Sequence, residues 1–60
     1  MNIQKILVAD DHPIFRQGLI RTIESHSSFN IIAEVNDGME AFNKIKELKP
    51  DIAILDISMP

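Results

Sequence analysis

The sequence lacks three features, and each absence excludes a class of protein. It contains no cysteine, which excludes disulfides and thiolate metal sites within the chain. Its longest apolar runs, residues 6–9 and 52–55, are only four residues long, far too short to span a bilayer. It also lacks a surplus of positive charge. The net charge of −3 makes this segment a poor ligand for nucleic acid or an anionic membrane.

What the chain contains is typical of part of a cytoplasmic globular protein. The N-terminus has no apolar signal-peptide segment, so we expect a cytoplasmic location. Hydrophobic residues make up 45% of the chain, which suits a packed core rather than a disordered tail. A chain of 60 residues forms one small domain or part of one. We expect marginal stability, because such a chain buries only about 60% of the surface that unfolding exposes.

Apolar periodicity predicts strand, helix, strand, helix, strand along the chain. Continuous apolar runs predict strands over 5–9 and 52–55. An apolar repeat of four residues predicts a helix over 13–25, whose first turn Asp11 can cap. The second helix is expected to begin at Asp37, three residues before Glu40 in the spacing of a capping box, and to end before Pro50.

The remaining strand, over 29–35, alternates only in part and is therefore predicted to be an edge strand. Its residues expected to share one face are Phe29, Ile31, Ala33 and Val35.

Strands that alternate with helices at this spacing predict an α/β fold with a parallel sheet and right-handed crossovers. The continuous runs are typical of strands buried on both faces, so the first and third strands should be neighbours, in the order 2-1-3. Nothing in the sequence covers the far edge of the third strand. We therefore expect either the first half of a larger domain or a second chain at this edge, and an isolated chain that is unstable or self-associates.

Acidic residues follow the two apolar strands directly. Asp10 and Asp11 end the first, and Asp56 ends the third. Because the carboxyl ends of neighbouring parallel strands meet at one edge, about 4.8 Å apart, these carboxylates should converge and repel one another. A divalent cation relieves that repulsion, and a donor set made only of oxygen favours Mg²⁺. Asp56 would then be placed to attack a phosphoryl group held by the metal.

The segments "KILVADDHPIFRQGL" and "DIAILDISMP" resemble the two signature segments of the response-regulator receiver domain of two-component signalling. "ADDHP" and "LD-x-x-MP" are most similar to the NarL/FixJ-type subfamily. The resemblance covers the whole chain, which would be the N-terminal half of an incomplete flavodoxin-like receiver fold, with three of its five strands.

The resemblance also implies roles for individual residues. Asp56 matches the phosphoacceptor, and Asp10 and Asp11 match the acidic pair that binds Mg²⁺ beside it. Ser58 stands where the family offers a main-chain carbonyl to the metal, and Pro60 matches the proline that shapes the following loop.

The resemblance implies that a sensor histidine kinase transfers a phosphoryl group to Asp56 and so controls a transcriptional output. Such a receiver assists its own phosphorylation and dephosphorylation and is not a turnover enzyme. The remaining receiver elements, and any DNA-binding output domain, would lie outside residues 1–60. Contact with DNA would come only through that domain, and no membrane is involved.

Two other functions fit parts of the pattern. A Mg²⁺-dependent phosphohydrolase also places an aspartyl nucleophile at a strand end, although such enzymes carry a second acid where this chain has Ser58. A receiver-like module that associates through the open edge and is never phosphorylated is the other alternative. His12 is interpreted as a solvated loop residue beside the site rather than as a phosphohistidine or general base.

Overall fold

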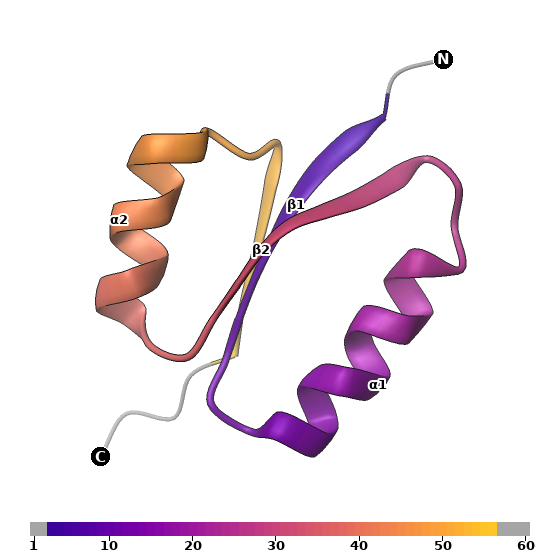
Figure 1. Cartoon of the computed structure of the whole chain (residues 1–60), viewed down its shortest axis with the longest axis horizontal. Helices are drawn as coiled ribbons and strands as arrows, with labels where there is room; N and C mark the ends of the chain where they lie inside the picture. The colour runs from indigo at the N-terminus through magenta and orange to yellow at the C-terminus, as the bar shows by residue number, and fades with distance from the viewer. Residues whose placement is uncertain (1–2, 57–60) are drawn as a thin grey trace.

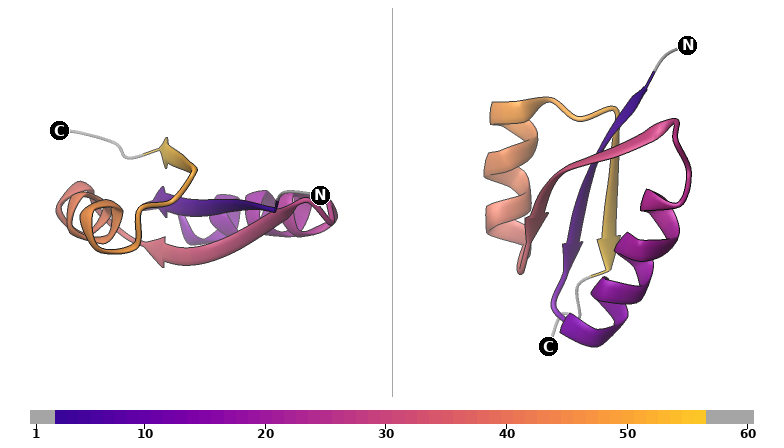
Figure 2. Two further views of the ribbon diagram at one scale, coloured as in Figure 1. Left: turned by 90° about the horizontal axis from the view of Figure 1, so that it is seen from above. Right: turned by 45° about the vertical axis from the view of Figure 1, so that its right-hand side comes forward.

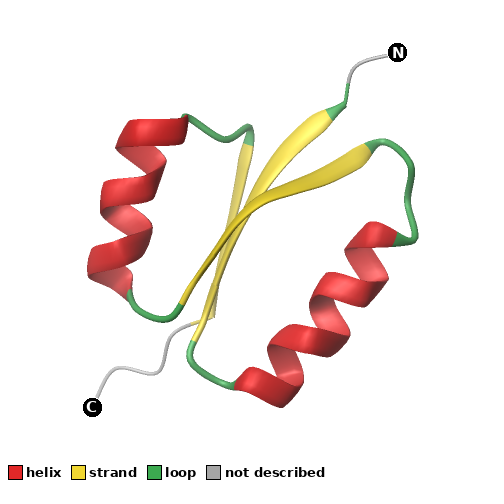
Figure 3. Cartoon of the chain, viewed as in Figure 1, coloured by secondary structure: helices red, strands yellow, loops and turns green. Residues whose placement is uncertain are grey.

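The computed structural model describes residues 3–56. Three strands alternate with two helices (Figures 1 and 3), and the three strands are parallel in the order β2-β1-β3. This confirms the predicted α/β topology and strand order. The elements are β1 (Gln4–Asp10), α1 (Pro13–Glu24), β2 (Phe29–Val35), α2 (Gly38–Leu48) and β3 (Ile52–Asp56).

β1 forms the centre of the core because it has a strand on each side and a helix over each face. Ile6, Leu7, Val8 and Ala9 are all buried. Leu7 and Ala9 pack towards Ala41 of α2, whereas Ile6 and Val8 pack towards α1. Figure 1 shows the two helices on opposite sides of the sheet, and the left view of Figure 2 shows them flanking the three strands. The continuous apolar run of β1 is thus explained by burial on both faces.

The prediction that one face of β2 carries all four alternating residues is wrong. The register of β1 and β2 shifts between Ile6 and Leu7, so that Ile32 is an extra residue in β2. Such a bulge reverses the alternation of side chains beyond it. Phe29 and Ile31 therefore pack on the α1 side, and Ala33 and Val35 pack on the α2 side.

β3 is less buried than its apolar run suggested. Ile54 packs against the α1-side core, but the side chains of Ile52 and Leu55 are exposed. The reason is that both helices pack over β1 and β2, and within residues 3–56 β3 pairs only with β1. The expectation of burial on both faces is therefore wrong for the described chain, whereas the expected open edge is confirmed for it.

Local hydrogen bonds account for the bounds of α2. The Asp37 carboxylate accepts the Glu40 N–H at 2.8 Å, which confirms Asp37 as the N-cap. The Glu40 carboxylate reaches back one residue further than a capping box requires and accepts the Asn36 N–H at 3.2 Å. At the other end Lys49 adopts the left-handed conformation, with φ 51°, directly before Pro50. Among residues 3–56, neither helix is long and apolar enough to cross a membrane.

Candidate functional site

The register of β1 and β3 brings two of the predicted site residues side by side. Asp10 and Asp56 are direct partners at the carboxyl ends of these parallel strands. At the opposite end, the Asp51 carboxylate accepts the Lys5 N–H at 2.7 Å, and the Asp51 N–H donates to the Lys5 carbonyl at 2.8 Å. These two bonds extend the β1–β3 pairing to its far end, so Asp51 helps to hold the register that places Asp10 beside Asp56. Sequence reasoning had not assigned Asp51 this role.

Asp10 is the buried member of the site, with only 1% of its surface exposed. One carboxylate oxygen, Oδ1, accepts the His12 N–H at 2.7 Å. The other, Oδ2, is buried without a hydrogen-bond partner among the described residues. A buried carboxylate oxygen that lacks a partner is costly unless a cation compensates it.

Asp11 and His12 lie in the loop between β1 and α1. His12 Nδ1 lies 2.8 Å from Asp11 Oδ1 and 3.5 Å from Asp10 Oδ1. The prediction that Asp11 caps α1 is wrong. His12 is the N-cap residue and makes no side-chain capping bond. The carboxylate of Asp11 lies beside the imidazole, and Pro13 at the helix start has no N–H to offer.

Arg16 is a site residue that the sequence reasoning missed. Its Nη1 donates to the carbonyls of Asp10 and Val35, both at 3.2 Å, and to Asn36 Oδ1 at 2.6 Å. It therefore ties the carboxyl ends of β1 and β2 to the start of α1. A signal was present, because a cation close to the positive N-terminal end of a helix is unfavourable and indicates a specific partner.

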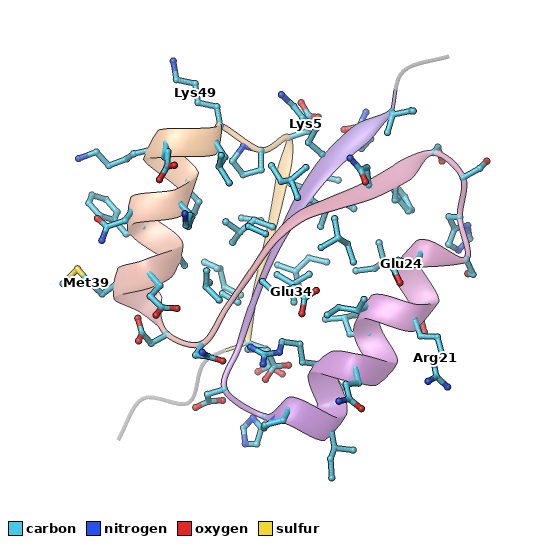
Figure 4. The ribbon with its side chains drawn as sticks, viewed as in Figure 1. Lys5, Arg21, Glu24, Glu34, Met39 and Lys49 are labelled. Atoms are coloured by element: carbon cyan, nitrogen blue, oxygen red, sulfur yellow. The ribbon has the colours of Figure 1, made fainter. Side chains whose placement is uncertain are left out.

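No lysine or arginine within residues 3–56 forms an ion pair with the carboxylate of Asp10, Asp11 or Asp56. Figure 4 shows Lys5 and Lys49 near the far end of the sheet, where β1 and β3 begin. The Arg16 side chain donates its hydrogen bonds to carbonyl and amide oxygens. The negative charge at the strand ends is thus not balanced by a lysine or arginine among the described residues, and an added cation could balance it.

The donor set fits a divalent cation. Asp10, Asp11 and His12 each offer one ligand atom, and these atoms all lie within 4.8 Å of one another. Asp56, which is exposed at the end of β3, is not a member of this group, although it is the register partner of Asp10. Ser58 and Pro60, which the resemblance assigned to the metal and to the loop, lie outside the described residues.

The comparisons with known proteins agree with the geometry. The family model of the response regulator receiver domain matches residues 6–60. The transcriptional regulatory protein NarL of Mycobacterium tuberculosis (strain H37Rv) is 43% identical over 56 residues, covering 93% of this chain and 26% of that protein. LnrK, a transcriptional regulatory protein of Bacillus subtilis (strain 168), is 45% identical with the same coverage. The chain thus spans about a quarter of the length of these relatives.

Solved structures give the same result. The signal receiver domain of NarL from M. tuberculosis superposes with a TM-score of 0.91 and 40% identity, covering 100% of this chain and 48% of that one. RcsB from Salmonella enterica serovar Typhimurium, bound to the promoter rprA with the phosphomimetic BeF3-, superposes with a TM-score of 0.86 and 32% identity. It covers 98% of this chain and 29% of that one.

Proposed function

The chain belongs to the response regulator receiver domain family, with NarL-type relatives, and on this premise we propose that Asp56 is its phosphoacceptor. A histidine kinase would donate the phosphoryl group from a phosphohistidine. An oxygen of the Asp56 carboxylate attacks phosphorus, the P–N bond breaks, and the imidazole of the kinase keeps the bonding electron pair.

The observation that carries this proposal is the register pairing of Asp10 with Asp56. The buried Asp10, one oxygen of which has no partner within residues 3–56, is suited to hold a cation, and the exposed Asp56 is accessible to a donor. Asp10 and Asp11 would bind Mg²⁺, with Asp56 and the main-chain carbonyl of Ser58 as further ligands. Bound Mg²⁺ supplies neutralisation of the charge on the phosphoryl oxygens. Arg16 and Asp51 then act as positioning residues that hold the strand ends in register.

The wider role rests on the relatives, which are named as transcriptional regulators. We infer that residues 1–60 are the N-terminal half of a receiver whose remaining elements, together with a DNA-binding output domain, belong to a longer cytoplasmic protein. Phosphorylation of Asp56 would shift the receiver between two states and so control transcription. Receiver domains of this family are signalling domains, which argues against the phosphohydrolase alternative.

Phosphorylation is tested by incubating the full-length protein with acetyl phosphate and Mg²⁺ and measuring the intact mass. We expect one added phosphoryl group on the wild type, none on Asp56→Asn, and none when a chelator removes Mg²⁺. Glu24→Gln, which changes an exposed acid at the end of α1, is the matched control and should behave as wild type.

Phosphate release and association, measured on the same proteins, separate the alternatives. Release of phosphate through many cycles per chain would favour a phosphohydrolase. A wild-type protein that never gains phosphate but still associates through β3, where Ile52 and Leu55 are exposed, would favour the association module.

A further inference from the structure

His12 is the one side chain of the Asp10–His12 group to which the proposed phosphotransfer assigns no role. Its Nδ1 nevertheless lies among the carboxylate oxygens of Asp10 and Asp11, all within 4.8 Å. An imidazole nitrogen in this place changes the donor set from oxygen alone to mixed oxygen and nitrogen. That change bears on which cation the site selects.

Two of the distances are close to those between ligands that share one cation. Two ligand atoms that are each about 2.1 Å from Zn²⁺, at tetrahedral or octahedral angles, lie about 3.0–3.4 Å apart. His12 Nδ1 lies 2.8 Å from Asp11 Oδ1 and 3.5 Å from Asp10 Oδ1, so the two separations bracket this range. The third separation, between the Asp10 and Asp11 oxygens, is at most 4.8 Å.

Hydrogen bonds hold the backbone of His12 through both its N–H and its carbonyl, which restricts where the imidazole can lie. The His12 N–H donates to Asp10 Oδ1 at 2.7 Å, and its carbonyl accepts the Arg16 N–H at 2.9 Å. Pro13 follows and further restricts the His12 backbone. The imidazole itself is 59% exposed, which leaves a path for a cation to enter.

The burial of Asp10, a different property from the spacing of the ligand atoms, also points to a cation. The Asp10 side chain is completely buried, and its Oδ2 has no partner among the described residues. The bond from the His12 N–H satisfies only Oδ1. Since His12 approaches Oδ1 and not the orphaned oxygen, its presence does not remove the need for a metal.

We propose that His12 Nδ1 joins the carboxylates of Asp10 and Asp11 as a ligand for a transition-metal cation, with Zn²⁺ as the probe. This rests on the proposed cation site at Asp10 and Asp11. Imidazole is a good ligand for Zn²⁺, whereas Mg²⁺ takes oxygen ligands and keeps much of its water. His12 therefore strengthens Zn²⁺ binding selectively, and Zn²⁺ competes with Mg²⁺ for the same carboxylates.

The test compares Zn²⁺ and Mg²⁺ affinities of the full-length wild type, His12→Gln and His26→Gln by titration calorimetry. His26 is the matched control because it is exposed beyond the other end of α1, where its ring contacts Phe29. We expect His12→Gln to weaken Zn²⁺ binding about tenfold or more while leaving Mg²⁺ affinity nearly unchanged. His26→Gln should change neither affinity.

A ¹⁵N NMR titration of the wild type makes the result independent of how the variant folds. Zn²⁺ should shift the Nδ1 resonance of His12 strongly, and Mg²⁺ should not. Equal loss of both metals in His12→Gln, unchanged Zn²⁺ binding, or an unshifted Nδ1 would each overturn the assignment of His12. Failure of Mg²⁺ to bind the wild type, while Zn²⁺ still shifts His12, would instead overturn the proposed Mg²⁺ role and leave this inference standing.

Discussion

Replacement of Asp10 by Asn should stabilise the metal-free protein and at the same time abolish its stabilisation by Mg²⁺. The wild-type carboxylate is buried, one of its oxygens has no partner in the described part of the chain, and it lies at the same end of the sheet as the charges of Asp11 and Asp56. An asparagine keeps the shape and can still accept the His12 N–H through its amide oxygen. It removes the buried charge, and a neutral amide costs less to bury than a carboxylate.

The size of the effect follows from the hydrogen bonds of Asp10. Oδ1 is satisfied by the His12 N–H, so only Oδ2 contributes a penalty. One unsatisfied buried polar group costs about 1–3 kcal/mol, and more when it is charged. Asparagine still buries an unpaired amide nitrogen in the place of Oδ2, so only the extra cost of the charge is removed, and we expect Asp10→Asn to raise the opening free energy of metal-free β1 by about 1 kcal/mol. Mg²⁺ at a hundredfold excess over its dissociation constant should stabilise the wild type by about 2.7 kcal/mol and the variant hardly at all.

Hydrogen–deuterium exchange of the β1 amides measures this opening free energy in the full-length protein, with and without Mg²⁺. Glu24→Gln serves as the control for loss of an acid at an exposed position and should stay within about 0.5 kcal/mol of the wild type. If Asp10→Asn is less stable than the wild type without metal, or is stabilised by Mg²⁺ as much as the wild type, then Asp10 is not a buried charge that a bound cation compensates.

Three further predictions concern the elements that hold the site. Arg16→Met keeps the aliphatic part of the side chain but loses three hydrogen bonds. It should lower the free energy of unfolding in urea by about 1–3 kcal/mol and weaken Mg²⁺ binding. Unchanged stability and Mg²⁺ binding would show that Arg16 does not hold the strand ends in place. Asp37→Ala removes the cap of α2 and should cost about 1 kcal/mol, seen as faster exchange in the first turn of α2. Leu55→Lys places a charge on the exposed strand β3 and should reduce the self-association of the isolated 60-residue chain, measured by sedimentation. Unaltered association would mean that the chains contact one another elsewhere.

The elements that the sequence predicts well are those set by local chemistry. The apolar runs and the capping signal at Asp37 place each strand and helix to within a residue or two, because periodicity and capping depend on neighbours in sequence. The pairing of Asp10 with Asp56 also follows, since parallel strands that end together bring their terminal residues together.

The features that sequence reasoning missed depend on contacts between distant segments. The bulge at Ile32 depends on how β2 fits β1, so the alternation within β2 could not reveal the change of face after Ile31. Arg16 donates hydrogen bonds to Val35 and Asn36, which are 19 and 20 residues away. Nothing in the sequence around Val35 or Asn36 identifies them as its partners. The error at Asp11 is local instead: its residue type suits a cap, but the structure places its carboxylate beside the neighbouring His12.

We propose above all that the neighbouring strand ends make Asp56 a metal-assisted phosphoacceptor. The most direct measurement is to locate the phosphoryl group by tandem mass spectrometry after reaction of the full-length protein with acetyl phosphate and Mg²⁺. We expect a single acyl phosphate on Asp56 that requires both Mg²⁺ and Asp10. A phosphoryl group on His12, or one that forms equally well without metal or in Asp10→Asn, would contradict it.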